Sequence, residues 1–435
     1  MKKRILVVLL LLALISSGTA LFANGQQEPA EEQAGDGTTT ITWWALSGGG
    51  GADDPRENAR LEMIKEFEAA HPGVHVDLVM LENEAFKQKI QVAIQAGDPP
   101  DLFHSWGGGV MAEYAAAGML KDITPAVENE LSKTIGLGAL GVYSVLGQYY
   151  GAPYDMGAVG MWYNKDIFEA AGVEVPTTWA ELLSIIPKIK EAGYIPISVG
   201  AGDKWPAMYW WVYLAMRCGG QDAFNKAYSG SGSFADAPYV KAGELLNELI
   251  ALEPFQTGFL GSSYDDEASL MGNGKAAMEL MGQWAPAVEV ANSVSGTGIG
   301  DSLGWFAFPA VAGGAGAATD VMGGGGGYVL GKDAPEETVE LLKFFLTKEN
   351  NMKMVEVEGS VPVVAGADEA VKGNPNMVKM IDTIASAGYY QLYYDQILPP
   401  AVGAAVNDAV ASLFAGMSTP EECAQSIQDA WEASK

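Results

Sequence analysis

Short apolar runs alternate with amphipathic segments along most of the chain. Residues 40–46 (TITWWAL) and 74–81 (VHVDLVML) are rich in β-branched and aromatic side chains, which is typical of strands. Between them, apolar residues recur at the three- and four-residue spacing of one helix face. A second amphipathic segment, 84–96, precedes another short strand at 101–103. The order strand, helix, strand, helix, strand predicts an α/β fold, with a parallel sheet covered by helices.

The same alternation continues through the middle of the chain. A short strand at 161–163 is followed by a helix ending at Gly172. Thr178 and Glu181 form the sequence signature of a capping box, which predicts that a helix begins there. Residues 195–199 are the next predicted strand. The pattern establishes the α/β class but not the order of the strands within a sheet.

The first 39 residues are unlike the rest of the chain. Lys2, Lys3 and Arg4 precede an apolar run and then small residues up to Ala23, which is the order of a secretory signal peptide. We therefore predict a signal peptide at 1–23, with an uncleaved anchor as the alternative. Residues 24–39 are polar and lack tryptophan and tyrosine, so we predict a flexible tether. Export predicts a periplasmic or extracellular location.

Composition adds size and charge to this picture. The chain has 435 residues, of which 49% are hydrophobic, so it exceeds the size at which one core usually divides into two. The formal net charge is −29, because 54 Asp and Glu outnumber 25 Lys and Arg. Such a surface repels phosphate backbones, so we expect no nucleic acid partner. We expect a monomer.

The common catalytic and metal-binding motifs are missing from the sequence. It has three histidines and neither an H-E-x-x-H nor a G-x-S-x-G motif, so we predict no metal and no cofactor. The glycine run 323–327 lacks the Lys-Ser/Thr of a phosphate loop and is more typical of a flexible or close-packed turn. Export would permit Cys218 and Cys423 to form a disulfide, but their separation in sequence leaves pairing open.

Aromatic residues gather where predicted strands end, together with carboxylates and amides. In open α/β sheets this is where a ligand cleft forms. Indole and phenol rings stack on the C–H faces of sugars, and carboxylates and amides bind sugar hydroxyls. We therefore predict a sugar site rather than separate core positions. The aromatic residues are Trp43, Trp44, Trp106, Trp205, Tyr209, Trp210, Trp211, Trp284, Tyr389, Tyr390, Tyr393 and Tyr394, and the polar ones are Glu82, Asp101, Asp155, Gln283 and Asp395.

Four stretches of the sequence resemble family 1 extracellular solute-binding proteins, the maltose-binding-protein-like receptors of ABC sugar importers. Together they extend over nearly all of the chain beyond the tether. The stretches are 67–76 (FEAAHPGVHV) with 96–102 (AGDPPDL), 150–155 (YGAPYD) with 162–168 (WYNKDIF) and 176–179 (PTTW), 274–278 (GKAAM) with 282–284 (GQW), and 341–347 (LLKFFLT) with 359–363 (GSVPV).

The resemblance implies a two-lobed periplasmic-binding-protein fold, with discontinuous lobes joined by hinge crossings. Lobe one would contain residues 40–152 and 309–359. Lobe two would contain residues 153–308 and 360–435. The implied crossings lie near 151–154, 308–310 and 360–363.

The resemblance also implies a function without covalent chemistry. The protein would capture a mono- or oligosaccharide between its lobes and deliver it to the membrane permease of an ABC transporter. Position in the family carries over Trp284, Asp155, the loop 104–106, Trp205, Trp210 and the segment 393–395. The complete predicted ligand set is Trp43, Trp44, Glu82, His104, Trp106, Asp155, Trp205, Trp210, Trp284, Gly324, Tyr394 and Asp395.

Two other function classes remain open from sequence. An exported glycan-degrading enzyme would need two carboxylates about 5–10 Å apart across one sugar site. Asp155, or the adjacent pair Asp265 and Asp266, would be candidates for that role. The third possibility is a ligand sensor that docks onto a receptor and is not coupled to transport.

Overall fold

The computed structural model describes residues 38–47 and 54–435. The predicted signal peptide, 1–23, and nearly all of the predicted tether, 24–39, lie outside the described residues. Within the described part, none of the helices combines the length and the apolar character needed to cross a bilayer.

The first sheet confirms the strands predicted at the start of the chain. Its order is β2 (Val74–Leu81), β1 (Thr39–Leu46), β3 (Leu102–Ser105), β13 (Gly327–Leu330) and β6 (Gly151–Pro153). β1 and β3 are parallel, with Trp43 beside Leu102, whereas β13 is antiparallel to both of its neighbours. We call this sheet and the helices packed on it lobe one.

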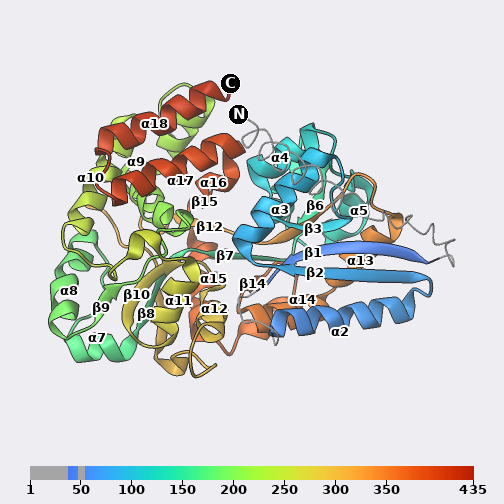
Figure 1. Ribbon diagram of the computed structural model, residues 1–435, viewed down its shortest axis with the longest axis horizontal. Helices are drawn as coiled ribbons and strands as arrows, with labels where there is room; N and C mark the ends of the chain where they lie inside the picture. Colours follow the sequence, from blue (N-terminus) through green and yellow to red (C-terminus); the bar gives the residue numbers. More distant parts are fainter. Residues whose placement is uncertain (1–37, 48–53) are drawn as a thin grey trace, which may run out of the picture. The chain divides into compact units, whose positions relative to one another are not determined.

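Helices cover both faces of the first sheet. Side chains of α2 (Pro55–Ala70), α13 (Glu336–Phe345) and α14 (Lys348–Glu358) pack on the face that contains Trp43. Side chains of α3 (Asn83–Ala96) and α4 (Gly108–Ala116) pack on the opposite face. Figure 1 shows α2 and α14 on one side of β1 and β2, and α3 on the other. The helices of lobe one are α2 (Pro55–Ala70), α3 (Asn83–Ala96), α4 (Gly108–Ala116), α5 (Thr124–Asn129), α6 (Leu137–Gly141), α13 (Glu336–Phe345) and α14 (Lys348–Glu358). A short hairpin, β4 (Ser144–Val145) with β5 (Gln148–Tyr149), completes it.

The rest of the described structure, which we call lobe two, contains two four-stranded sheets. One has the order β11 (Leu303–Phe306), β8 (Gly160–Asn164), β10 (Ala276–Met281) and β9 (Ile195–Ile197). The other has the order β14 (Val361–Pro362), β7 (Asp155–Ala158), β12 (Val321–Gly324) and β15 (Tyr390–Leu392). Parallel and antiparallel pairs occur in both, whereas the sequence pattern predicted a parallel sheet.

The helices of lobe two surround a large apolar core. The long helix α9 contributes most of its side chains to that core. Thr178 and Glu181 form the predicted capping box at the start of α8. The helices are α7 (Lys165–Ala171), α8 (Trp179–Glu191), α9 (Trp205–Ser229), α10 (Ala237–Ile250), α11 (Tyr264–Gly272), α12 (Ala285–Ala291), α15 (Pro375–Ser386), α16 (Tyr394–Ile397), α17 (Pro400–Phe414) and α18 (Pro420–Ala433). Cys218 and Cys423 are both free thiols.

Within residues 54–435, the chain crosses between the lobes three times. It leaves the first sheet between β6 and β7, returns between β12 and β13, and leaves again between α14 and β14. The first and third crossings lie close to the positions implied by sequence. The second lies at residues 324–327, later than the implied 308–310, because β12 pairs with β7 and β15 and not with the first sheet.

The glycine run 323–327 allows the second crossing to lie directly against the first. A Cβ atom on Gly325 would stand 2.1 Å from the carbonyl oxygen of Asp155, and one on Gly323 would stand 2.1 Å from that of Gly157. No side chain fits at those distances, so the run is a close-packed turn between two strands.

Candidate ligand-binding cleft

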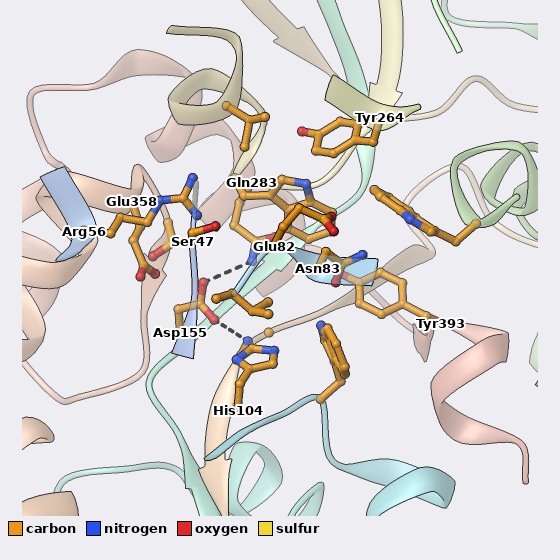
Figure 2. Close-up of a pocket in the computed structure, with 18 of the residues that line it drawn as sticks. Ser47, Arg56, Glu82, Asn83, His104, Asp155, Tyr264, Gln283, Glu358 and Tyr393 are labelled. Carbon is orange, nitrogen blue, oxygen red and sulfur yellow. Dashed lines mark hydrogen bonds between the residues drawn. The ribbon is translucent and has the colours of Figure 1, made fainter. Parts of the chain in front are cut away.

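A cavity lies where the two lobes face each other, lined by residues from both (Figure 2). Its volume is about 140 Å³, and the space around it is continuous with solvent. Its residues from lobe one are Leu46, Ser47, Arg56, Arg60, Glu82, Asn83, Lys87, His104, Trp106 and Glu358. Those from lobe two and the crossings are Tyr154, Asp155, Trp205, Tyr209, Tyr264, Asp265, Gln283, Trp284, Val288, Gly325, Gly326, Ser360, Tyr393, Asp395 and Gln396.

The structure brings many of the sequence-predicted site residues together in this cavity. They come from strand ends and helix starts that are distant in sequence, as the fold class led us to expect. Those that line it are Glu82, His104, Trp106, Asp155, Trp205, Trp284 and Asp395.

Three predicted residues point into apolar cores and do not line the cavity. Trp43 is fully buried behind β1, with its ring edge-on to Tyr328 and Phe345. Trp210 and Tyr394 are buried in the core of lobe two. In each case the residue lies near the cavity in sequence, but its side chain points the other way, because adjacent residues on a strand or helix point to different sides.

Trp44 and Gly324 also lie outside the cavity lining. Trp44 is on the opposite face of β1 from Trp43, and the ammonium of Lys89 lies 4.4 Å from its ring centroid. Gly324 is paired with Gly157 inside the sheet, and the next two glycines of the run reach the cavity instead.

Sequence reasoning missed the cations on the cavity wall, namely Arg56, Arg60 and Lys87. A signal for Arg60 was present, because it occupies the same helix face as the buried Met63, Ile64 and Phe67. A charged residue within an apolar face needs a buried partner or a ligand.

Aromatic rings form the lobe-two wall of the cavity. Trp205 lies at the centre, with ring centroids 5.4 Å from Tyr209, 5.0 Å from Tyr264 and 6.3 Å from Trp284. Tyr393 stacks on Tyr209 at 5.4 Å. Because each ring packs against another, the wall is a preformed apolar surface.

The lobe-one wall offers a single indole, that of Trp106. Its ring is edge-on to His104, with 4.5 Å between ring centroids, and to Phe86 at 5.9 Å. The ammonium of Lys87 lies 5.8 Å from the ring centroid of Trp106 and donates to Glu84 Oε1 at 2.8 Å. Both walls therefore present flat rings to the same space.

A buried ion pair stands at the back of the cavity. Arg60 Nη2 donates to Glu358 Oε1 at 2.8 Å, and Arg60 Nε donates to the hydroxyl of Tyr328 at 3.1 Å. Arg60 is 1% exposed, so its charge depends on these partners.

Asp155, the first residue of β7, accepts two hydrogen bonds. Its Oδ1 accepts from the backbone N–H of Gly326 at 2.5 Å, and its Oδ2 accepts from Gln283 Nε2 at 3.2 Å (Figure 2). Burial, and then the nearby carboxylate of Glu358, raise the pKa of Asp155 to about 7. The carboxyl group is thus divided between its neutral and charged forms near neutral pH.

His104 is a neutral side chain in the cavity. Burial, and then the charges of Arg60 and Lys87, lower the pKa of His104 to about 3. Its Nδ1 lies 3.4 Å from the hydroxyl of Tyr154. The other ring nitrogen has no hydrogen-bond partner among the described residues.

Several other buried polar atoms of the cavity also lack a partner within the described residues. Leaving such an atom unpaired costs about 1–3 kcal/mol, so each favours a ligand that supplies the missing hydrogen bond. Both donors and acceptors occur among them, which suits a ligand rich in hydroxyl groups. The atoms are Arg60 Nη1, Trp205 Nε1, Tyr264 Oη, Gln283 Oε1, Ser360 Oγ, Tyr393 Oη and Gln396 Oε1.

The two adjacent acids Asp265 and Asp266 have different surroundings. Asp265 lines the cavity, whereas Asp266 forms a capping box with Ser263 at the start of α11. In residues 38–47 and 54–435, no group of three or more His, Cys, Asp or Glu is arranged to hold a metal ion.

Two lobes, three crossings and a cavity between them define the class of two-lobed binding proteins. The family model for bacterial extracellular solute-binding proteins matches residues 52–352, and the chain belongs to that family. The resemblance seen in the sequence is therefore confirmed.

Known relatives resemble much of the chain. It is 28% identical over 229 residues to an uncharacterized ABC transporter extracellular-binding protein of Pyrococcus horikoshii, an alignment covering 51% of this chain and 52% of that protein. It is 27% identical over 320 residues to the multiple sugar-binding protein of Streptococcus mutans, covering 71% of this chain and 72% of the relative. A solved structure concerned with xylan utilization by the thermophilic bacterium Caldanaerobius polysaccharolyticus superposes with a TM-score of 0.82 at 26% identity, covering 90% and 99% of the two chains.

Proposed function

We propose that this protein is an extracytoplasmic carbohydrate receptor that captures a mono- or oligosaccharide between its lobes and delivers it to an ABC transporter permease. The observation that carries the proposal is the cavity itself. Indole rings from both lobes face it, and buried donors and acceptors without protein partners lie among them.

These two features match the two kinds of surface on a sugar. The C–H faces of a pyranose ring stack on Trp106, Trp205 or Trp284, which removes apolar surface from water. The ring hydroxyls supply the hydrogen bonds that His104 Nε2 and Gln283 Oε1 lack. A sugar with a hydroxyl in the wrong orientation leaves such an atom unpaired, which gives selectivity between epimers.

Closure of the lobes excludes water from the ligand and strengthens each polar contact. Micromolar affinity corresponds to about −8 kcal/mol, which a few stacked rings and several hydrogen bonds can supply. The sheets support lobes of residues 40–153 with 327–358, and 155–324 with 360–435. The proposal includes a signal-directed periplasmic or extracellular location, a monomeric state and no covalent chemistry on the sugar.

Isothermal titration calorimetry tests the proposal with maltotriose, xylotriose, raffinose and their component monosaccharides. We expect at least one sugar to bind with micromolar or tighter affinity and one-to-one stoichiometry. Absence of binding to sugars, together with binding of a peptide or polyamine, would reject the ligand class. Turnover of a chromogenic glycoside by the purified protein would instead favour the glycan-degrading enzyme.

A further inference from the structure

All three crossings between the lobes meet at the side chain or backbone of one residue, Asp155. It follows the first crossing directly in sequence. Its carboxylate accepts the N–H of Gly326 in the second crossing at 2.5 Å. Its backbone is paired with Pro362, just after the third crossing, in the ladder of β7 with β14. A movement of one lobe relative to the other therefore changes the surroundings of this residue.

The packing around Asp155 leaves little freedom for the crossings to move independently. A Cβ atom on Gly325 would stand 2.1 Å from the carbonyl oxygen of Asp155. A Cβ atom on Gly326 would stand 2.3 Å from the hydroxyl of Tyr154 and 2.9 Å from His104 Cε1. The first and second crossings are in backbone contact, so they must flex together.

The same carboxylate faces the ligand cavity. Its second oxygen accepts from the amide of Gln283, which follows β10 and precedes Trp284. Asp155 and Gln283 both line the cavity, and Figure 2 shows the carboxylate between Gln283 and His104. A ligand that fills this space covers the 5% of Asp155 that is still exposed.

Asp155 is surrounded by titratable groups from several elements. The carboxylate of Glu358, at the end of α14, acts on Asp155 with a charge of the same sign and is itself paired with Arg60 of α2. Burial and Glu358 both disfavour the charged carboxylate, whereas the bonds from Gly326 and Gln283 favour it. The other titratable groups facing this region are the neutral His104 of β3 and the phenols of Tyr143, Tyr154, Tyr390 and Tyr393.

We propose that Asp155 is a positioning residue that couples closure of the lobes to the uptake of one proton. The proposal deepens the proposed function, since the ligand is taken to be a neutral sugar. Closure and ligand binding take water away from the carboxyl group, so its neutral form is favoured in the closed state. Because the closed, liganded protein then holds more protons than the open protein, sugar affinity falls as pH rises through neutrality.

Small-angle X-ray scattering tests the coupling without any ligand. The wild type, Asp155→Asn and the control Asp77→Asn are compared at pH 5.5 and 8.5. We expect the wild-type radius of gyration to be larger at pH 8.5. The amide introduced by Asp155→Asn cannot ionise, so this variant is expected to stay compact at both values. Asp77→Asn removes an exposed carboxyl of β2, outside the cavity lining, and is expected to follow the wild type.

Equal wild-type radii at the two pH values would overturn the coupling, and this result does not depend on any variant folding. A pH response that persists in Asp155→Asn, with native circular dichroism, would also overturn it.

Calorimetry with maltotriose or xylotriose supplies a second readout. Wild-type affinity is expected to fall at least threefold between pH 6 and pH 8.5, and the affinity of Asp155→Asn is expected to be flat. Affinity that instead rises with pH would mean that the sugar donates to a charged Asp155, which contradicts the proposal. If no sugar of the calorimetric panel binds at any pH, the proposed function fails, and the scattering result still decides the coupling.

Discussion

The ammonium of Lys87 lies 5.7 Å from the ring centroid of Trp205, although the two residues belong to different lobes. The same ammonium lies 5.8 Å from the ring of Trp106 and is anchored by Glu84. Lys87 thus bridges the indoles of the two cavity walls. A sugar ring that stacks on the same face of either indole as this cation must displace it.

From this contact we predict that the positive charge of Lys87 holds the two lobes together when no ligand is bound. Each cation–π contact contributes about 0.5–2 kcal/mol, depending on exposure. We expect Lys87→Met to increase the radius of gyration of the ligand-free protein in small-angle scattering. Lys87→Arg keeps the cation and is expected to stay compact. Identical scattering from the wild type and Lys87→Met would contradict the bridge.

Trp284 is expected to contribute ligand contact rather than stability. It lines the cavity and contacts Trp205 and Tyr393 by its ring edges or faces. Trp284→Ala removes one stacking surface, so we expect sugar affinity to fall at least tenfold in calorimetry with native circular dichroism. Trp44→Ala is the matched control, because Trp44 lies outside the cavity lining. Unchanged affinity in Trp284→Ala would remove that residue from the site.

A glycine near the start of α4 allows a steric test of lobe closure, because it lies against backbone atoms of lobe two. A Cβ atom on Gly109 would stand 2.6 Å from the carbonyl oxygen of Ile397 and 2.7 Å from that of Leu398, both in lobe two. We expect Gly109→Ala to hold the lobes apart, with a larger radius of gyration and weaker sugar binding. Gly138→Ala adds the same methyl group where nothing lies within 4 Å, and it should behave as the wild type. A compact, fully active Gly109→Ala would show that this contact does not form on closure.

Buried carboxyl groups in lobe two predict a pH-dependent stability. Glu279 and Glu289 are 0% and 1% exposed, and burial raises the pKa of Glu289 from 4.5 to about 7. The folded state therefore binds more protons than the unfolded state, and stability is lost as pH rises from about 4.5 through 7. We expect Glu289→Gln to raise Tm more at pH 8.5 than at pH 5, by on the order of 2 °C or more. The exposed Glu62→Gln is the control, and an equal effect of Glu289→Gln at both pH values would refute the assignment.

Local signals in the sequence were sufficient to predict the fold class and many cavity residues. The strands at 40–46 and 74–81 follow from residue type, and the helix at Thr178 follows from its capping box. Glu82, Trp106 and Trp284 were predicted because they stand at strand ends, where such folds place their clefts.

The sequence did not predict which way each side chain points, or which strands and charges pair across long distances in the chain. Trp43 and Trp44 are equally aromatic, but only the pairing of β1 decides which face each occupies. The second crossing was implied too early because β12 is short and glycine-rich, and its partners β7 and β15 are far away in the chain. Arg60 was missed because its partner Glu358 is 298 residues away.

A crystal structure with the tightest-binding sugar of the calorimetric panel is the most direct test of the account. We predict electron density for the sugar in the cavity, with a ring stacked on Trp205 or Trp284 and another contact from Trp106 in the opposite lobe. Hydroxyl groups of the sugar should lie within hydrogen-bond distance of His104 Nε2 or Gln283 Oε1. Sugar density elsewhere on the molecule, with this cavity filled only by water, would contradict the account.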